Sequence, residues 1–155
     1  MKGKEDGFTL VETLISLLIV SFLILLPVLS IKDTLQSIEV DLFFRELTSN
    51  ITLMQNHAIL MGESTSIDFV PSKKLIRFSV HDGKNTESSP LNREMNLDDS
   101  ICRYYGNASQ KVYFKANTGN ISVVYNRWKI KFKTVNNLYE LVFRLGSGRF
   151  EIRKK

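Results

Sequence analysis

Residues 8–31 form an apolar run, FTLVETLISLLIVSFLILLPVLSI, which limits the possible folds of this chain more than any other feature. As an α-helix with a rise of about 1.5 Å per residue, its roughly 24 residues would be about 36 Å long. The hydrocarbon core of a bilayer is about 30 Å thick, so such a helix could cross it with some tilt. The sequence therefore predicts a transmembrane helix over residues 8–31.

One acidic residue, Glu12, lies near the start of this run, and the run contains no Lys or Arg to neutralise it. A charged carboxylate at mid-membrane costs about 2.5 to 3.5 kcal/mol, and less near an end, so a lone one needs a partner. A cleavable secretory signal would be shorter and would end in a small-residue cleavage site, which is not found after residue 31. An ordinary signal anchor fits the length, with Lys2 and Lys4 on the cytoplasmic side, but it does not explain Glu12.

The basic leader MKGKEDG, the stretch Phe-Thr-Leu-Val-Glu at residues 8–12 and the long apolar helix together resemble the class III signal of type IV pilins and pseudopilins. The resemblance implies that a prepilin peptidase cuts between Gly7 and Phe8, removes the leader 1–7 and methylates the amine of Phe8. It also implies that Glu12 pairs with the N-terminal amine of a neighbouring subunit during filament assembly. The alternative is a Glu12 carboxylate that reaches headgroup water or is protonated.

The helical pattern continues beyond the membrane segment. Apolar residues recur at steps of mostly three and four, which predicts an amphipathic helix over residues 32–62. Gly62 suits the left-handed conformation that often ends helices. Pro27 is expected to kink the long helix near its middle, because proline removes one backbone donor. The predicted apolar face consists of Ile31, Leu35, Ile38, Leu42, Leu47, Ile51, Met54, Ala58 and Met61.

Residues 63–155 are predicted to form a head built on one antiparallel sheet of about six or seven short strands, because alternating stretches are separated by turn signals. The polar segment of about residues 82–100 is expected to be an exposed loop, with room for one short element around residues 94–97. The fold class is therefore α+β and pilin-like, with the long helix packed on the sheet. The strand stretches are 64–70, 74–80, 111–114, 121–126, 128–135, 138–145 and 148–154.

Motifs of enzyme chemistry are missing from the sequence: it has no Gly-rich phosphate loop, nucleophile elbow or metal-ligand spacing. His57 and His81 are expected to be surface residues. Cys102 is the single cysteine, so an internal disulfide is excluded, and it should be a packing residue or an exposed thiol, with an intermolecular disulfide as the remaining alternative. We expect no enzyme activity, no metal and no cofactor.

Positive charge is in excess: beyond the leader and Glu12 the chain holds 19 basic and 13 acidic side chains, a net charge of +6. In WKIKFK, residues 128–133, Lys129, Lys131 and Lys133 alternate with apolar residues and should point away from the core. They could contact DNA phosphates. The alternative is a solvated sheet face, which is favoured because no aromatic residue is expected on that face.

The head is small and poor in cysteine, and with the FTLVETLISLLIV stretch it resembles minor pseudopilins of Gram-positive competence machinery and H-class pseudopilins of type II secretion. This implies a structural subunit of a DNA-uptake pilus that takes part in transformation. The subunit would be single-pass in the cell membrane with its head outside, and at the cell surface once assembled. Its partners would be the prepilin peptidase, the major and other minor pseudopilins, a membrane platform protein and an assembly ATPase, with nucleic acid met only indirectly.

Two alternatives to this function stay open. The first is a minor pseudopilin of a type II secretion or type IV pilus system. The second belongs to a different class and is a membrane-anchored DNA-binding module.

Overall fold

A computed structural model of the 155-residue chain describes residues 9–81, 89–98, 101–105, 109–123, 129–144 and 146–155. Within the helix, the side chains of residues 25–30 and 32–33 lie outside the described part. The chain divides into two compact units, Met1–Ile38 and Glu39–Lys155.

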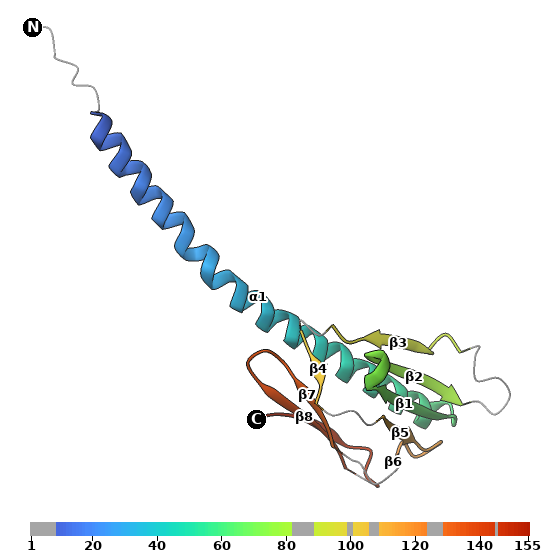
Figure 1. The fold of residues 1–155 in the computed structure, drawn as a ribbon. Helices are drawn as coiled ribbons and strands as arrows, with labels where there is room; N and C mark the ends of the chain where they lie inside the picture. The colour runs from blue at the N-terminus through green and yellow to red at the C-terminus, as the bar shows by residue number, and fades with distance from the viewer. Residues whose placement is uncertain (1–8, 82–88, 99–100, 106–108, 124–128, 145) are drawn as a thin grey trace, which may run out of the picture. The chain divides into compact units, whose positions relative to one another are not determined.

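Helix α1 extends from Leu10 to Leu60 without interruption (Figure 1). Its length agrees with the predicted continuous helix. The helix continues through position 27, and the kink expected at Pro27 stays a prediction. Gly62 follows with φ of +69°, the left-handed conformation anticipated for the residue that ends the helix.

The first unit contains residues 10–38 of α1. Its large apolar side chains between Leu10 and Ile24 are between 52% and 76% exposed. The predicted span of residues 8–31 includes Phe8 and the side chains 25–30, which lie outside the described residues. Among the described residues, no helix is both long enough and apolar enough to cross a membrane.

The second unit is the head, in which residues 39–60 of α1 pack on β-strands. Phe43 of α1 meets Phe132 with ring centroids 6.0 Å apart, and Thr65 Oγ1 donates a hydrogen bond to the Met54 carbonyl at 3.0 Å. The predicted apolar face is buried only in part, because five of its members are exposed: Ile31, Leu35, Ile38, Leu42 and Met61. The buried helical residues of the head core are Val40, Phe43, Phe44, Leu47, Ile51, Met54 and Ala58.

The described strands form two antiparallel sheets, so the prediction of one sheet needs correction. The five-stranded sheet has the order β3-β2-β1-β5-β6, and the four-stranded sheet has the order β4-β7-β8-β9. The first contains β1 (Ser64–Val70), β2 (Leu75–His81), β3 (Arg93–Asn96), β5 (Gln110–Phe114) and β6 (Ile121–Val123). The second contains β4 (Arg103–Tyr104), β7 (Lys129–Lys133), β8 (Leu138–Phe143) and β9 (Phe150–Lys154), and the short 3-10 helix η1 (Pro71–Lys73) joins β1 to β2.

Both sheets contribute to one core. The ring of Phe69 in β1 lies 6.4 Å from those of Phe132 in β7 and Phe143 in β8. Within the expected loop of about residues 82–100, β3 lies where one short element was expected around residues 94–97, and it pairs with β2. Residues 82–88 and 99–100 of that segment lie outside the described part.

Candidate functional site

Helix α1 begins with a capping box made by Thr9 and Glu12. The Glu12 backbone N–H donates to Thr9 Oγ1 at 3.3 Å, and the Thr9 backbone N–H donates to Glu12 Oε2 at 3.4 Å. The Thr9 hydroxyl also lies 3.5 Å from the same carboxylate oxygen. Two of the backbone donors that a helix start leaves open are thereby satisfied. The carboxylate is held at the positive end of the helix dipole by groups of its own chain.

Glu12 is exposed, and so are its apolar neighbours Leu10, Val11, Leu14 and Ile15. Among the described residues, no Lys, Arg or His forms an ion pair with it. The carboxylate therefore has hydrogen bonds within the chain but no described counter-charge. The predicted cleavage and methylation positions, Gly7 and Phe8, lie outside the described residues, so the structure does not place them against Glu12.

The predicted lysines lie on the outer face of the four-stranded sheet. Lys129 and Lys133 are exposed and Lys131 is half-buried, whereas Ile130 and Phe132 between them are buried. The alternation within β7 is therefore confirmed for residues 129–133. Trp128 lies outside the described residues.

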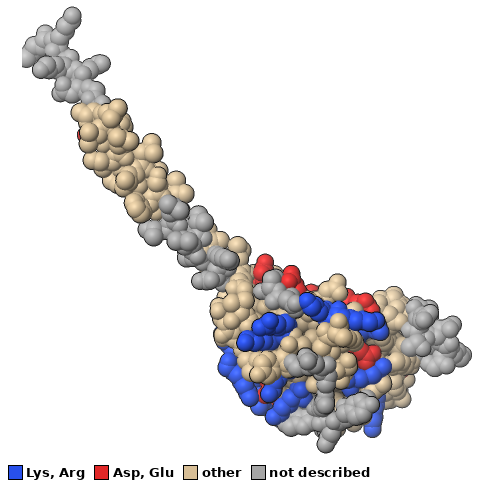
Figure 2. All heavy atoms as spheres, viewed as in Figure 1, with Lys and Arg blue, Asp and Glu red and all other residues tan. Residues whose placement is uncertain are grey.

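The strand register adds cations from the neighbouring strands to the same face. Arg103 of β4 lies opposite Lys133. Arg153 of β9 lies opposite Glu140, which in turn lies opposite Lys131. The Lys155 backbone N–H donates to the Leu138 carbonyl at 2.8 Å, which places Lys155 two strands from Lys133. Figure 2 shows Lys and Arg atoms over several parts of the head, including the part where Figure 1 places β7 and β8.

An exposed aromatic residue, Tyr105, lies on this face as well. Its backbone N–H donates to the Lys131 carbonyl at 2.8 Å, and its ring centroid is 6.0 Å from Lys131 Nζ. The expectation of a face without an aromatic residue is therefore wrong. No sequence pattern predicts this position of Tyr105, because β4 is too short to show a period and its pairing with β7 is long-range.

A groove of about 290 Å³ lies at the turn between β7 and β8, beside Tyr105. The turn is fixed by Thr134, whose backbone N–H donates to the Asn137 carbonyl at 2.9 Å and whose Oγ1 accepts from the Asn137 N–H at 3.1 Å. The lining residues are Tyr105, Lys133, Thr134, Val135, Asn136, Asn137, Leu138 and Lys155.

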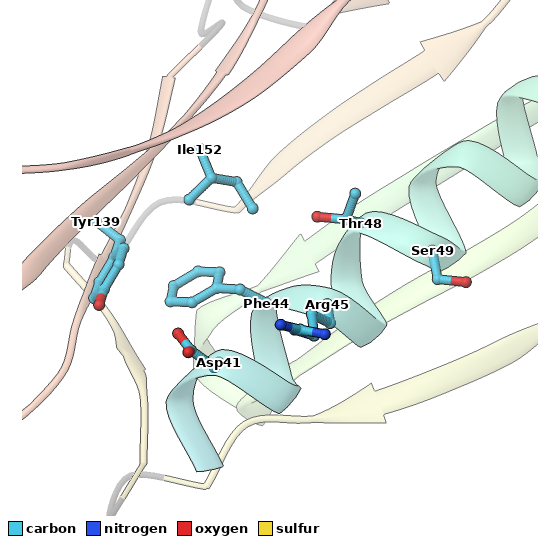
Figure 3. Close-up of a pocket in the computed structure, with 7 residues that line it drawn as sticks. All are labelled: Asp41, Phe44, Arg45, Thr48, Ser49, Tyr139 and Ile152. Carbon is cyan, nitrogen blue, oxygen red and sulfur yellow. The ribbon is translucent and has the colours of Figure 1, made fainter. Parts of the chain in front are cut away.

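A larger groove, of about 530 Å³, lies in the head between α1 and strands β8 and β9 (Figure 3). The rings of Phe44 and Tyr139, with centroids 4.5 Å apart, and Ile152 form its apolar side. Asp41, Arg45, Thr48 and Ser49 complete it from the helix.

Both histidines lie beside hydrogen-bonding side chains, and the cysteine is buried. His57 Nε2 lies 2.8 Å from Glu63 Oε2, and His81 Nε2 lies 2.9 Å from Ser66 Oγ. Burial, and then the charge of Lys111, lower the pKa of His81. Burial raises the pKa of the Cys102 thiol to about 12, so the cysteine is a packing residue. The described residues contain no group of three or more His, Cys, Asp or Glu that could hold a metal ion.

Comparison with known families adds one finding. Residues 2–26 match the family model of the prokaryotic N-terminal methylation motif. No curated protein and no solved structure gives a significant match to the chain. The matched segment contains Gly7, Phe8, Thr9 and Glu12, and the α+β architecture of the chain is consistent with a pilin-like fold. Residues 2–26 of the chain thus carry a prokaryotic N-terminal methylation motif, the class III type of signal.

Proposed function

We propose that this chain is a minor pseudopilin, a structural subunit of a DNA-uptake pilus that takes part in natural transformation. The observation that carries the proposal is the methylation motif at residues 2–26, followed by one uninterrupted helix from Leu10 to Leu60. The choice of a DNA-uptake pilus rests on the small, cysteine-poor head and its resemblance to minor competence pseudopilins. A structural subunit needs no catalytic residues or cofactor.

Residues 8–31 would anchor the subunit in the cell membrane before assembly, with the head outside and the leader 1–7 in the cytoplasm. Support comes from the apolar sequence and from the exposed apolar side chains between Leu10 and Ile24. These side chains are unfavourable in water and are suited to lipid or to the helices of other subunits.

Glu12 would act during assembly by changing partners. Within one subunit the capping box with Thr9 supplies hydrogen bonds but leaves the carboxylate charge without a described cation. The methylated amine of Phe8 in a neighbouring subunit would neutralise that charge in the low-dielectric core of the filament. A charge that is compensated only after docking favours the filament over the isolated subunit and fixes the register of the helices.

The partners follow from this assembly route. A prepilin peptidase would cleave and methylate the subunit, and major and other minor pseudopilins would pack against its helix. A membrane platform protein and a cytoplasmic assembly ATPase would drive addition. The assembled subunit would lie at the cell surface.

Mass spectrometry of the protein from cells that make the peptidase tests the proposal. We expect a mature chain that begins at N-methyl-phenylalanine, shorter than the precursor by the leader 1–7. Replacing Gly7 with leucine should leave the precursor uncut, because a bulky side chain hinders the extended backbone from entering the peptidase cleft. An intact Met1 in the wild-type protein would refute the proposed processing.

A deletion strain separates uptake from secretion. Loss of the gene should abolish transformation and leave protein export intact. The opposite pattern would assign the subunit to a type II secretion system, which is the closest alternative within the family.

A further inference from the structure

We propose that the outer face of the four-stranded sheet, together with the groove at the β7–β8 turn, binds single-stranded nucleic acid. We define the basic face as Arg103, Lys129, Lys131, Lys133, Arg153 and Lys155. The inference goes beyond the proposed assembly role and depends only on the head.

Charge gives the first argument. Among the described residues of this face, the six cations outnumber two carboxylates, Glu140 and Glu151. Glu140 is buried with Lys155 Nζ at 3.9 Å, and Glu151 is already paired with Arg144 and Arg153. No described carboxylate forms an ion pair with Arg103, Lys131 or Lys133, so positive potential remains at the β4–β7 side of the face.

The spacing of these cations gives the second argument. Along β7, Lys129, Lys131 and Lys133 follow one another at about 7 Å, because alternate residues share a face. Across the sheet, Arg103 and Lys133 lie opposite each other on neighbouring strands about 4.8 Å apart, and Lys155 lies in the same row two strands from Lys133, beyond Leu138. A phosphodiester backbone running along β7 would meet a cation at each step, and such contacts do not depend on base sequence.

The aromatic ring decides between single-stranded and duplex nucleic acid. Tyr105 is 59% exposed and lies beside Lys131, so one face of its ring can accept a stacked base. The adjoining groove of about 290 Å³ offers the amides of Asn136 and Asn137 for a base edge and the cations of Lys133 and Lys155 for its phosphate. Bases within a duplex are stacked on each other and cannot reach a ring in this way. The combination therefore favours an unpaired strand.

Binding is tested with the full-length precursor in neutral detergent micelles, so that processing and filament assembly play no part. The probes are a fluorescently labelled oligo-dT of about 15 nucleotides and a duplex of the same length, followed by anisotropy at several salt concentrations. We expect the single strand to bind at least tenfold more tightly than the duplex, with affinity falling as salt rises.

Variants at the two lysines and at Tyr105 locate the site. Lys131→Glu with Lys133→Glu should lower affinity for both probes more than tenfold and reduce the salt slope, since each lost phosphate contact removes about 0.7 from it. Tyr105→Ala should lower single-strand affinity about tenfold and leave the duplex unchanged, while Tyr105→Phe keeps the ring and should bind like the wild type. Lys73→Glu with Lys115→Glu is the matched control, because both lysines are exposed and lie outside the basic face.

Three results would overturn the inference. The first is salt-dependent binding that is equal for single strand and duplex and indifferent to Tyr105→Ala, which would indicate only a general polyanion surface. The second is loss of binding in the control variant to the same extent as in the Lys131 and Lys133 variant. The third is no binding of either probe at the lowest salt concentration. None of these results would affect cleavage at Gly7, so failure here is distinguishable from failure of the proposed function.

Discussion

The two ends of helix α1 have the same secondary structure but opposite surroundings. Between Leu10 and Ile24 the large apolar side chains are more than half exposed, whereas Leu47, Ile51 and Met54 are completely buried. The sheets of the head cover the second segment, but no described part of the chain covers the first. The head therefore buries its own segment of α1, whereas the large apolar side chains between Leu10 and Ile24 are exposed. Under the proposed function, lipid or other subunits would cover these side chains.

The largest expected effect comes from a change at the covered end. Leu47→Ala removes a fully buried side chain from the core and should lower the free energy of unfolding of the head by about 2 to 5 kcal/mol. The measurement is urea unfolding of the detergent-solubilised chain, followed by near-UV circular dichroism. Leu14→Ala, on the uncovered end, is the control and should change the unfolding of the head by less than about 0.5 kcal/mol. Equal effects would mean that Leu47 is no more important for the stability of the head than the exposed Leu14.

The second prediction concerns the charge at the uncovered end. Glu12→Ala should still insert and still be cleaved, because removing a charge makes membrane residence easier. Incorporation should fall at least tenfold. A charged carboxylate costs about 2.5 to 3.5 kcal/mol at mid-membrane, and the relief of this cost on docking is lost when the carboxylate is removed. Crosslinking to other pseudopilins and transformation frequency provide the measurements. Glu39→Ala is the matched control on the same helix, and normal crosslinks in the Glu12→Ala strain would make the carboxylate irrelevant to assembly.

The extent of α1 and the position of β1 could be predicted from the sequence, because both depend on local signals. The apolar run, the period of three and four, and Gly62 predicted the extent of α1, and β1 occupies the predicted residues 64–70. The buried face of the helix was harder. Phe43 and Phe44 are buried in place of Leu42, because both sets of positions satisfy the same spacing and only the sheets determine which set is covered.

Strand pairing and the position of Tyr105 could not be predicted from local sequence patterns. Strand β4 has two residues, so the partner of β7 and the position of Tyr105 could not be deduced from a pattern. The division into two sheets likewise depends on contacts between distant residues. The capping box, in contrast, follows a local motif of threonine and glutamate three residues apart, and Thr9 with Glu12 could have been recognised.

The third prediction separates the capping role of Glu12 from its proposed role in assembly. Thr9→Val removes the hydroxyl of the capping box at nearly constant shape and should destabilise the first turn of α1 by about 0.5 to 2 kcal/mol. Faster amide hydrogen exchange at residues 10–13 in micelles would report the loss. Thr13→Val is the control, because its hydroxyl bonds to the Leu10 carbonyl inside the helix. Assembly should fall less in Thr9→Val than in Glu12→Ala, and an equal loss would mean that Glu12 acts only by capping.

The smallest expected effect lies in the head, at His81. Burial and the charge of Lys111 lower its folded pKa, whereas Asp68 acts in the opposite direction. As pH falls below the ordinary value near 6.5, the unfolded chain takes up the proton before the folded chain does, so the head loses stability until both forms are protonated. His81→Gln keeps a side chain that can bond to Ser66 but cannot titrate, so its unfolding free energy should depend less on pH between about 7.5 and 5. Other titrating groups, including Glu151, affect the wild type and the variant equally, so they cancel when the two unfolding free energies are subtracted. If the variant and the wild type lose stability in parallel over this range, protonation of His81 is not coupled to folding of the head.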